Sequence, residues 1–459
     1  MINLPTIVLV DDKREELDVI HQSFVAEGFP CLPIQYVNEP GNVTGLDHVN
    51  LSHVTPRIII TDLNLQEQPK VEAQTLVGPI HEVLQKLTTN EPYLLYFWSK
   101  NEAVVNDVVA LLESRFKGEL QPPLLVGTLS KSEFMSPQGQ VQLKERVKSL
   151  LTDAPLMRAF LEWEGRIDKA ARMTTSSLFE LASPGDYLNF EQYKDSVNEE
   201  LGDLLAVIGN ETIGVKNAKS EPEVAIEQGL APVLHDHLNL ILQDVERDVW
   251  LTAVPKIGER LDINAQSKAK LNSFYHVDNV SENNPEEKRG TWVELNADYF
   301  GNQASLTSIK LKLGEPIKNI LHQEFLDSNQ GSKAQRSKAR DATKLGFLEL
   351  SAECDQAQRK TKLHRFCLTA LIPVEFEQFT TFRDGSSNTA HSGIYRLPNL
   401  FINGAEYIVK VSFMYQIGTK PENNKWFGEP KFRLKDQILA DISFKASQHA
   451  SRPGIIRFD

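Results

Sequence analysis

Polar side chains that could bind a cation or carry a chemical group follow directly after four apolar segments of this sequence. Residues 57–65 read R-I-I-I-T-D-L-N-L, so three isoleucines lead into Thr61 and Asp62. An unbroken run of β-branched residues is typical of a strand that is covered on both faces of a parallel sheet. Because ligands bind at the carboxyl ends of strands in an open α/β sheet, Asp62 is predicted to be a carboxylate at that edge.

The other three segments end in the same way. The residues that follow them are Asp11 and Asp12 after 6–10 (T-I-V-L-V), Ser99 and Lys100 after 93–98 (Y-L-L-Y-F-W), and Ser130 and Lys131 after 124–129 (L-L-V-G-T-L). Four predicted strands therefore end, in chain order, on an acidic pair, an aspartate, a serine and a lysine. Aspartates supply the hard oxygen ligands that a divalent cation prefers, and a lysine ammonium can bind an anionic group as a point charge.

Helices are predicted between these strands. Apolar residues at helical spacing mark helices at 13–27, 71–87, 101–116 and 141–151, and 31–37 is predicted to be the second strand. Strict alternation of strands and helices implies right-handed crossovers and a parallel sheet. We therefore predict an N-terminal α/β domain with a doubly wound parallel sheet over residues 1–153.

The order of these strand-end residues resembles that of the receiver domain of two-component response regulators. The resemblance implies a flavodoxin-like fold in which Asp62 accepts a phosphoryl group from a sensor histidine kinase. The other roles that it implies are Mg²⁺ binding, by Asp11, Asp12, Asp62 and the backbone carbonyl of Asn64, and phosphoryl binding, by Ser99 and Lys131. In such a domain the aspartate attacks the phosphorus of a phosphohistidine and becomes an aspartyl phosphate. A divalent cation is needed there because the phosphoryl group brings negative charge among carboxylates.

Three features depart from the pattern of that family. Ser132 stands where most receivers have a proline, and the turn at 63–66 (L-N-L-Q) lacks the usual downstream proline and glycine. The strand ends are also spaced more widely along the chain than in a typical receiver. These differences indicate a divergent branch of the family.

Length and composition exclude several classes of protein. A chain of 459 residues is expected to hold two or three domains. A formal net charge of −13 argues against a surface built as a whole for nucleic acid. No apolar run approaches the length of a membrane span, and the cysteines (Cys31, Cys354 and Cys367) lack C-x-x-C spacing. We therefore expect a reduced, cytoplasmic protein with no membrane segment and no disulfide framework.

The middle of the chain, residues 154–254, is predicted to be a helical connector. Apolar residues recur at helical spacing over 160–167, 201–208 and 234–245, and the polar stretch 209–222 is predicted to separate two helices. Because the apolar faces of such helices need a partner, the connector is also a candidate surface for a homodimer.

Residues 255–459 are predicted to form an α+β output domain. Predicted strands lie at 346–350, 366–372 and 405–415. Short strands with Pro and Gly turns indicate a small antiparallel sheet or barrel, and 432–451 is predicted to be an amphipathic helix. The basic stretch 333–344 has no interleaved aromatic residues, so we predict a solvated loop, which leaves a local contact with nucleic acid open.

A second candidate site lies in the run 349–358 (E-L-S-A-E-C-D-Q-A-Q) and in His364 after it. Cys354 and Asp355 could supply a nucleophile, or could bind a metal together with His364. No second Cys/His pair lies at zinc spacing, so a buried, structural Cys354 is the interpretation that we favour. The run, with the R-P-G ending at 452–454, resembles C-terminal domains found beside divergent receivers in bacterial conflict and phage-defence operons.

The predicted protein is thus a receiver-like domain, a helical connector and an output domain, switched by phosphorylation of Asp62. Two alternatives remain open at this point. In one, the domain is an unphosphorylated pseudo-receiver that docks partners within a defence complex. In the other, the output domain is a nuclease or hydrolase that the receiver gates.

Overall fold

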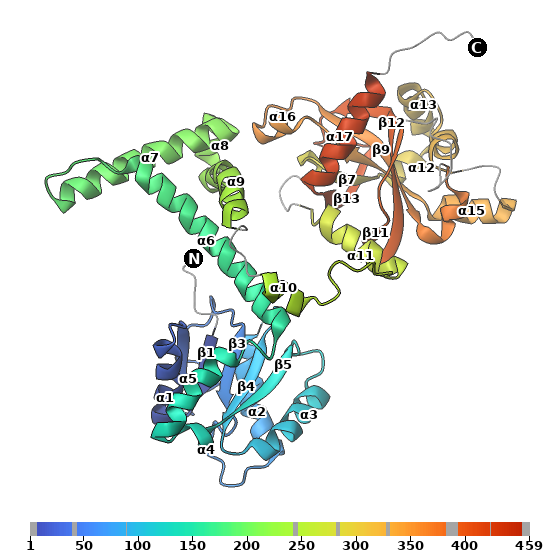
Figure 1. Cartoon of the computed structure of the whole chain (residues 1–459). Coiled ribbons are helices and arrows are strands. Elements are labelled where there is room, and N and C mark those ends of the chain that lie inside the picture. The colour runs from blue at the N-terminus through green and yellow to red at the C-terminus, as the bar shows by residue number, and fades with distance from the viewer. Residues whose placement is uncertain are drawn as a thin grey trace. The chain divides into compact units, whose positions relative to one another are not determined.

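The structure is a computed structural model and describes residues 7–38, 44–88, 90–241, 247–280, 285–326, 331–381, 393–422 and 424–451. The chain divides into two compact units (Figure 1). The first comprises Met1–Ser176 and Leu234–Glu259, and the second comprises Ser177–Val233 and Arg260–Asp459. The R-P-G ending at 452–454 lies outside the described residues. Within the described ranges, no helix combines the length and the apolarity that crossing a membrane requires.

The first unit contains a five-stranded sheet in the order β2-β1-β3-β4-β5, with every neighbouring pair parallel. Its strands are β1 (Ile7–Asp11), β2 (Cys31–Gln35), β3 (Ile58–Asp62), β4 (Leu94–Ser99) and β5 (Leu125–Ser130). This is the strand order of the flavodoxin-like doubly wound fold. The predicted α/β fold class of the N-terminal domain is therefore confirmed.

Helices cover both faces of this sheet. The helices are α1 (Arg14–Ala26), α2 (Ala73–Leu87), α3 (Val105–Arg115), α4 (Lys131–Phe134) and α5 (Pro137–Ser149). Leu9, Ile60 and Trp98 belong to the core with α1 and α5, whereas Ile59 and Phe97 belong to the core with α2 and α3. Successive strand residues point to opposite faces, so a strand covered on both faces is apolar throughout.

Two connections differ from the prediction. The described part of the link between β2 and β3 forms turns, whose Leu46 and Val54 pack into the core with α2 and α3. The predicted last helix begins earlier, at Pro137, because the Ser136 hydroxyl accepts a hydrogen bond from Gly139 N (3.0 Å) and caps it. A 3₁₀ turn (Glu102–Val104) precedes α3.

The middle of the chain is helical, as predicted: α6 (Pro155–Ala182), α7 (Phe190–Ile213), α8 (Val215–Ser220), α9 (Pro222–Ile241) and α10 (Arg247–Ala253). The predicted break between two helices does fall within 209–222, but it is shorter than predicted, because α7 continues to Ile213 and α8 fills most of the remainder. A Cβ on Gly229 would lie 2.4 Å from Ile208, so the glycine lets α7 and α9 approach closely. Gly214 ends α7 and precedes α8, and its φ of +85° suits glycine.

The second unit contains an eight-stranded antiparallel sheet in the order β10-β12-β9-β8-β7-β13-β6, with β11 paired to β12. Its strands are β6 (Val277–Asp278), β7 (Thr291–Leu295), β8 (Lys344–Glu349), β9 (His364–Pro373), β10 (Ile394–Arg396), β11 (Leu400–Ile402), β12 (Ala405–Thr419) and β13 (Phe427–Leu434). This sheet and the helices of the second unit together form the predicted α+β fold. The helices are α11 (Ala265–His276), α12 (Ala297–Gly301), α13 (Gln303–Leu313), α14 (Ile317–Ile320), α15 (Lys333–Ala342), α16 (Glu353–Ala357) and α17 (Asp436–Ala450).

Two local predictions in this unit are wrong. The basic stretch 333–344 is mostly helix rather than loop, because Ser332 and Gln335 form a capping box that starts α15. The helix predicted over 432–451 begins only at Asp436, because the preceding residues complete β13. The apolar face of α17 nevertheless packs on the sheet, with Ile438, Leu439 and Ile442 in the core.

Candidate functional site

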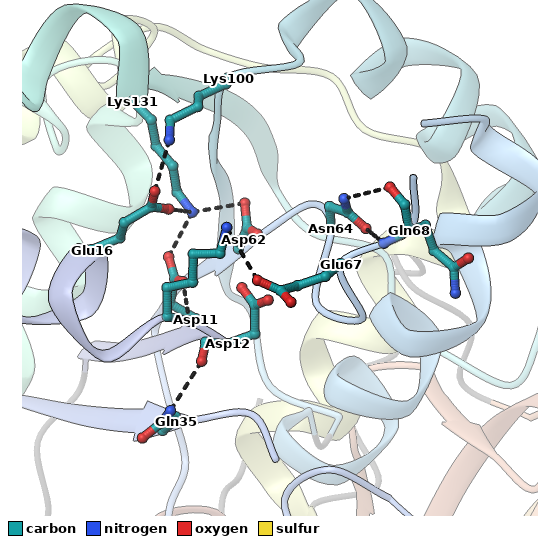
Figure 2. A network of polar contacts seen from close by, with 11 residues as sticks. Asp11, Asp12, Glu16, Gln35, Asp62, Asn64, Glu67, Gln68, Lys100 and Lys131 are labelled. Carbon is teal, nitrogen blue, oxygen red and sulfur yellow. Dashed lines mark hydrogen bonds and ion pairs between the residues drawn. The ribbon is translucent and has the colours of Figure 1, made fainter. Parts of the chain in front are cut away.

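Three carboxylates converge at the carboxyl edge of the parallel sheet (Figure 2). Asp11 ends β1, Asp12 follows it, and Asp62 ends β3. One oxygen atom from each lies within 4.8 Å of the others. Within the part of the chain that the structure describes, no other group of three or more acidic, histidine or cysteine residues is placed to hold a metal ion.

The Lys131 ammonium lies among these carboxylates. Lys131 begins α4 directly after β5 and is only 2% exposed. Its Nζ lies 2.7 Å from Asp11 Oδ2 and 3.0 Å from Asp62 Oδ1. Burial by itself lowers the pKa of an ammonium group, but Asp62 and Asp11 outweigh it and raise the pKa of Lys131. Lys131 therefore stays charged and holds the two strand-end carboxylates together.

The acidic cluster carries more negative charge than Lys131 can neutralise easily. Burial, with the neighbouring Asp62 carboxylate, outweighs Lys131 and raises the pKa of Asp11 to about 7. Burial and Asp62 also raise the pKa of Asp12. The Asp11 carboxyl is therefore partly protonated at neutral pH. A second cation bound in the cluster would lower its pKa and keep it ionised.

The donor set fits Mg²⁺. The Asp12 Oδ1 atom is buried and accepts no hydrogen bond from the described residues. A buried carboxylate oxygen without a partner is costly, and a divalent cation bound by carboxylate oxygens removes that cost. The Asn64 backbone carbonyl, which the resemblance adds to the ligands, accepts a hydrogen bond from Glu67 N (3.2 Å). Because a carbonyl oxygen has two lone pairs, that bond leaves one for a cation.

The Asn64 side chain has a separate role in this loop. Its Oδ1 accepts a hydrogen bond from Gln68 N (2.8 Å), and its Nδ2 donates to the Gln68 carbonyl (3.1 Å). The two bonds shape the turn after Asp62 without the proline and glycine that typical receivers use there. The sequence difference in this turn therefore leaves a well-formed loop.

Ser99 lies on the other side of the site, at the end of β4. It is buried, and its hydroxyl accepts a hydrogen bond from Asn101 N (3.0 Å) at the start of the segment leading to α3. A pocket of about 200 Å³ opens between the strand ends and is lined by Asp12, Lys13, Glu16, Asp62, Asn64, Glu67, Ser99, Lys100, Asn101 and Lys131. Five of the six residues predicted for this site thus line one opening, and the sixth, Asp11, contacts Lys131.

Glu16 and Lys100 also belong to this site, although neither was predicted to have a role in it. Glu16 Oε2 lies 2.7 Å from Lys131 Nζ, and Glu16 Oε1 lies 2.7 Å from Lys100 Nζ (Figure 2). Burial tends to raise the pKa of Glu16, but Lys100 and Lys131 lower it overall. The sequence signal that could have identified Glu16 is its position four residues after Asp12, in the first turn of the helix that follows β1. Any anion that binds Lys131 must compete with Glu16.

The predicted C-terminal cluster is not brought together. Cys354 is exposed in α16, so the expectation of a buried, structural thiol is wrong. Its Sγ lies 3.9 Å from Asp355 Oδ1, a contact between chain neighbours. His364 is buried at the start of β9, where its ring nitrogen Nδ1 contacts Glu349 and Gln356 and the ring lies beside Phe366. The short helix α16 turns the thiol outward, which periodicity could not indicate.

No protein-family model and no curated protein sequence matches this chain. The classification therefore depends on topology and on the site. The first unit has a receiver-like, flavodoxin-type fold. Its sheet order of 2-1-3-4-5 and its cluster of Asp11, Asp12 and Asp62 beside Lys131 support that description.

Binding of Mg²⁺ is expected to weaken as the pH falls. The pKa of Asp11 is about 7, so protons compete with the cation for this carboxylate below neutrality. Between about pH 8 and about pH 6 the ionised fraction of such a group falls about tenfold, and the affinity should fall with it. Isothermal titration calorimetry at both pH values measures the change. The Asp11→Asn variant should bind more weakly and show a smaller pH dependence; an affinity of the wild-type protein that is the same at both values would contradict the assignment.

Proposed function

We propose that this chain is a response-regulator-like switch in which Asp62 accepts a phosphoryl group from a partner histidine kinase. The observation that carries the proposal is the contact of Lys131 with both Asp62 and Asp11 beside a pocket that also contains Ser99. A nucleophilic carboxylate, two further acidic groups for a cation and a cation for the incoming anion are the parts that phosphoryl transfer requires.

In the transfer step, an Asp62 carboxylate oxygen forms a bond to phosphorus. The P–N bond to the donor histidine breaks at the same time, and its electron pair stays on the imidazole. Mg²⁺ bound by Asp11, Asp12 and Asp62 would neutralise charge on the phosphoryl group. Lys131 would leave Glu16 and bind one oxygen of the phosphoryl group, which carries more negative charge than a carboxylate. Ser99 would donate a hydrogen bond to another phosphoryl oxygen.

Uptake of a phosphoryl group from a small acyl phosphate in the presence of Mg²⁺ tests this proposal directly. The full-length protein should gain one phosphoryl group that is labile in base, as an acyl phosphate is. If the protein binds Mg²⁺ but takes up no phosphoryl group, the second candidate function is favoured.

The second candidate function is that of an unphosphorylated pseudo-receiver that docks partners. The observation that favours it is the ion pair between Glu16 and Lys131, which occupies the lysine that would otherwise bind a phosphoryl oxygen. For the second unit, a role in phage defence belongs to the proposal of a phosphorylated switch, whereas a nuclease or hydrolase gated by the receiver is an alternative to it.

The proposed route out of the site uses contacts within the first unit. Ser99 bonds to Asn101, so a movement of its hydroxyl toward a phosphoryl group would pull on the segment that leads to α3. Tyr96 in β4 donates a hydrogen bond to the Leu150 carbonyl (3.0 Å), just after α5. Arg57, immediately before β3, pairs with Glu164 of α6 (2.7 Å). Tyr96 and Arg57 thus connect the sheet to the residue after α5 and to α6, the first helix of the connector.

We further propose that phosphorylation changes a homodimer formed through the connector. Leu181, Leu188 and Phe190, around the turn between α6 and α7, are exposed apolar side chains. Light scattering should show a change of mass when Mg²⁺ and beryllofluoride, a phosphoryl mimic, are added, because packed helical interfaces tend to switch between discrete arrangements. Leu188→Ser should prevent the change. If the mass of the wild-type protein is the same with and without bound mimic, this coupling is wrong.

A further inference from the structure

A buried carboxylate–histidine pair lies in the second unit, outside the site described above. Glu349, at the end of β8, is completely buried, and its two oxygens accept hydrogen bonds from Ser351 N (3.1 and 3.2 Å). His364 begins the neighbouring strand β9, with its Nδ1 3.1 Å from Glu349 Oε1. A buried carboxylate is retained only where such partners compensate for the loss of water. The Glu349–His364 pair is therefore held in place by hydrogen bonds within the sheet and the residues that follow β8.

The pair leaves one ring nitrogen of His364 for a ligand. The described polar contacts of the ring, to Glu349 and to the Gln356 amide (3.2 Å), are both made by Nδ1. Glu349 also accepts backbone hydrogen bonds, so it is assigned as the ionised acceptor and Nδ1 as the protonated nitrogen. The ring also lines a pocket of about 240 Å³. Nε2 is thus the atom of His364 that can contact a bound molecule.

Two cationic side chains line the same pocket. Lys288 is exposed at its rim, and Arg359 follows α16 with a backbone φ of +49°. A non-glycine residue in this conformation costs energy and is found preferentially at functional sites. The Arg359 guanidinium binds the carboxylate of Glu221, which comes between α8 and α9 in the same unit. Its hydrogen bond, with the charge of Lys288 adding to the effect, lowers the pKa of Glu221. An anionic group therefore already occupies part of this pocket.

We propose that this pocket binds a small molecule through a phosphoryl group. Arg359 and Lys288 supply hydrogen bonds and charge, and His364 donates a third hydrogen bond from Nε2 when its imidazole is protonated at both nitrogens. The Glu221 carboxylate holds the place of the ligand when none is bound. Three donors around one opening suit a tetrahedral oxyanion, and a pocket of about 240 Å³ leaves room for more than the phosphoryl group itself. The proposal is independent of phosphorylation at Asp62.

Calorimetric titration of the full-length protein with pyrophosphate tests the proposal. Lys288→Gln should weaken binding by about tenfold, the usual effect of removing one charge-assisted contact. The matched control is Lys362→Gln, which changes the same charge at an exposed residue two positions from His364 that does not line the pocket. Glu221→Gln should tighten binding several-fold, because it removes the competing carboxylate. Equal effects of the two lysine variants would show general electrostatic attraction and overturn the proposal, as would undetectable binding to the Glu221→Gln variant.

The dependence on pH identifies the contribution of His364. The charged groups that face it are Glu349, Glu221, Glu287, Lys288 and Arg359. Since a protonated imidazole donates from both nitrogens, binding of sulfate, which stays fully ionised, should be stronger in acid than in base when a histidine supplies one of the donors. His364→Gln should remove this dependence. If the pH profile of a folded His364→Gln protein equals that of the wild type, the histidine is not part of the site.

Discussion

Replacing Asp62 with asparagine is expected to abolish uptake of a phosphoryl group by the full-length protein. A carboxamide cannot act as the nucleophile that forms an acyl phosphate, so the initial rate should fall by at least about 100-fold. Asparagine has nearly the same shape as aspartate, and it keeps an oxygen that can accept a hydrogen bond from Lys131. The protein, Mg²⁺ and an acyl phosphate donor are incubated together, and the mass of the intact protein is followed over time.

A matched variant separates this effect from a general loss of negative charge. Asp107→Asn removes one carboxylate from the exposed surface of α3, away from the pocket lining, and should keep the wild-type rate. Thermal unfolding of both variants shows whether each is folded. An Asp62→Asn protein that takes up phosphoryl groups at the rate of the wild type would mean that another residue is the acceptor.

Replacing Lys131 with methionine is expected to destabilise the first unit by about 3–5 kcal/mol, because it leaves buried charge without its partner. Lys131 is the shared partner of Asp11, Glu16 and Asp62. Methionine fills a similar volume, so the loss of the ammonium rather than a cavity dominates the change. For a unit of this size the melting temperature should fall by roughly 10 °C, as measured by circular dichroism.

Lys100→Met provides the control for this effect. Lys100 also pairs with Glu16, but 54% of its side chain is exposed, and an exposed pair contributes less than about 1 kcal/mol. Mg²⁺ should recover more stability in Lys131→Met than in the wild-type protein, since the cation replaces part of the lost positive charge. Similar melting temperatures for the two variants would show that Lys131 does not compensate the acidic cluster.

The pH gives a second test of the same charge balance. The pKa of Asp11 is raised from 3.8 to about 7, so its protonation favours the folded state. This contribution is fully present below about pH 4 and is lost as the pH rises through about 7. The loss of unfolding free energy in Lys131→Met, relative to the wild-type protein, should therefore be largest above neutral pH and smaller in acid.

The positions of Asp11, Asp12, Asp62, Ser99 and Lys131 could be predicted from the sequence because they depend on local order. A strand covered on both faces must be apolar throughout, so the residue at which the run ends marks the edge of the sheet. Strict alternation with helices makes the strands parallel, and parallel strands bring their carboxyl ends to one edge. Periodicity and connectivity thus determined both the fold of the first unit and which polar groups lie at that edge.

The partners of these groups were decided by the tertiary structure. Glu16 reaches Lys131 because α1 packs beside α5, near the start of α4, and nothing in a helical pattern specifies which neighbour a side chain will meet. Much of 209–222 is helical because Gly209 and Gly229 allow α7 and α9 to pack closely. The stabilisation from this packing exists only when both helices are present, so it cannot be read from either segment alone.

The second unit shows the same limit more strongly. Its strands are antiparallel and partly very short, and β12 shifts register between Val411 and Gln416, so few of them carry a clear pattern of alternation. The Glu349–His364 pair forms because β8 and β9 lie side by side, and the turn of α16 between them directs Cys354 to the surface. Local sequence determined where strands and helices could form, whereas contacts between distant segments decided which side chains became buried partners, because burial is a property of the packed chain as a whole.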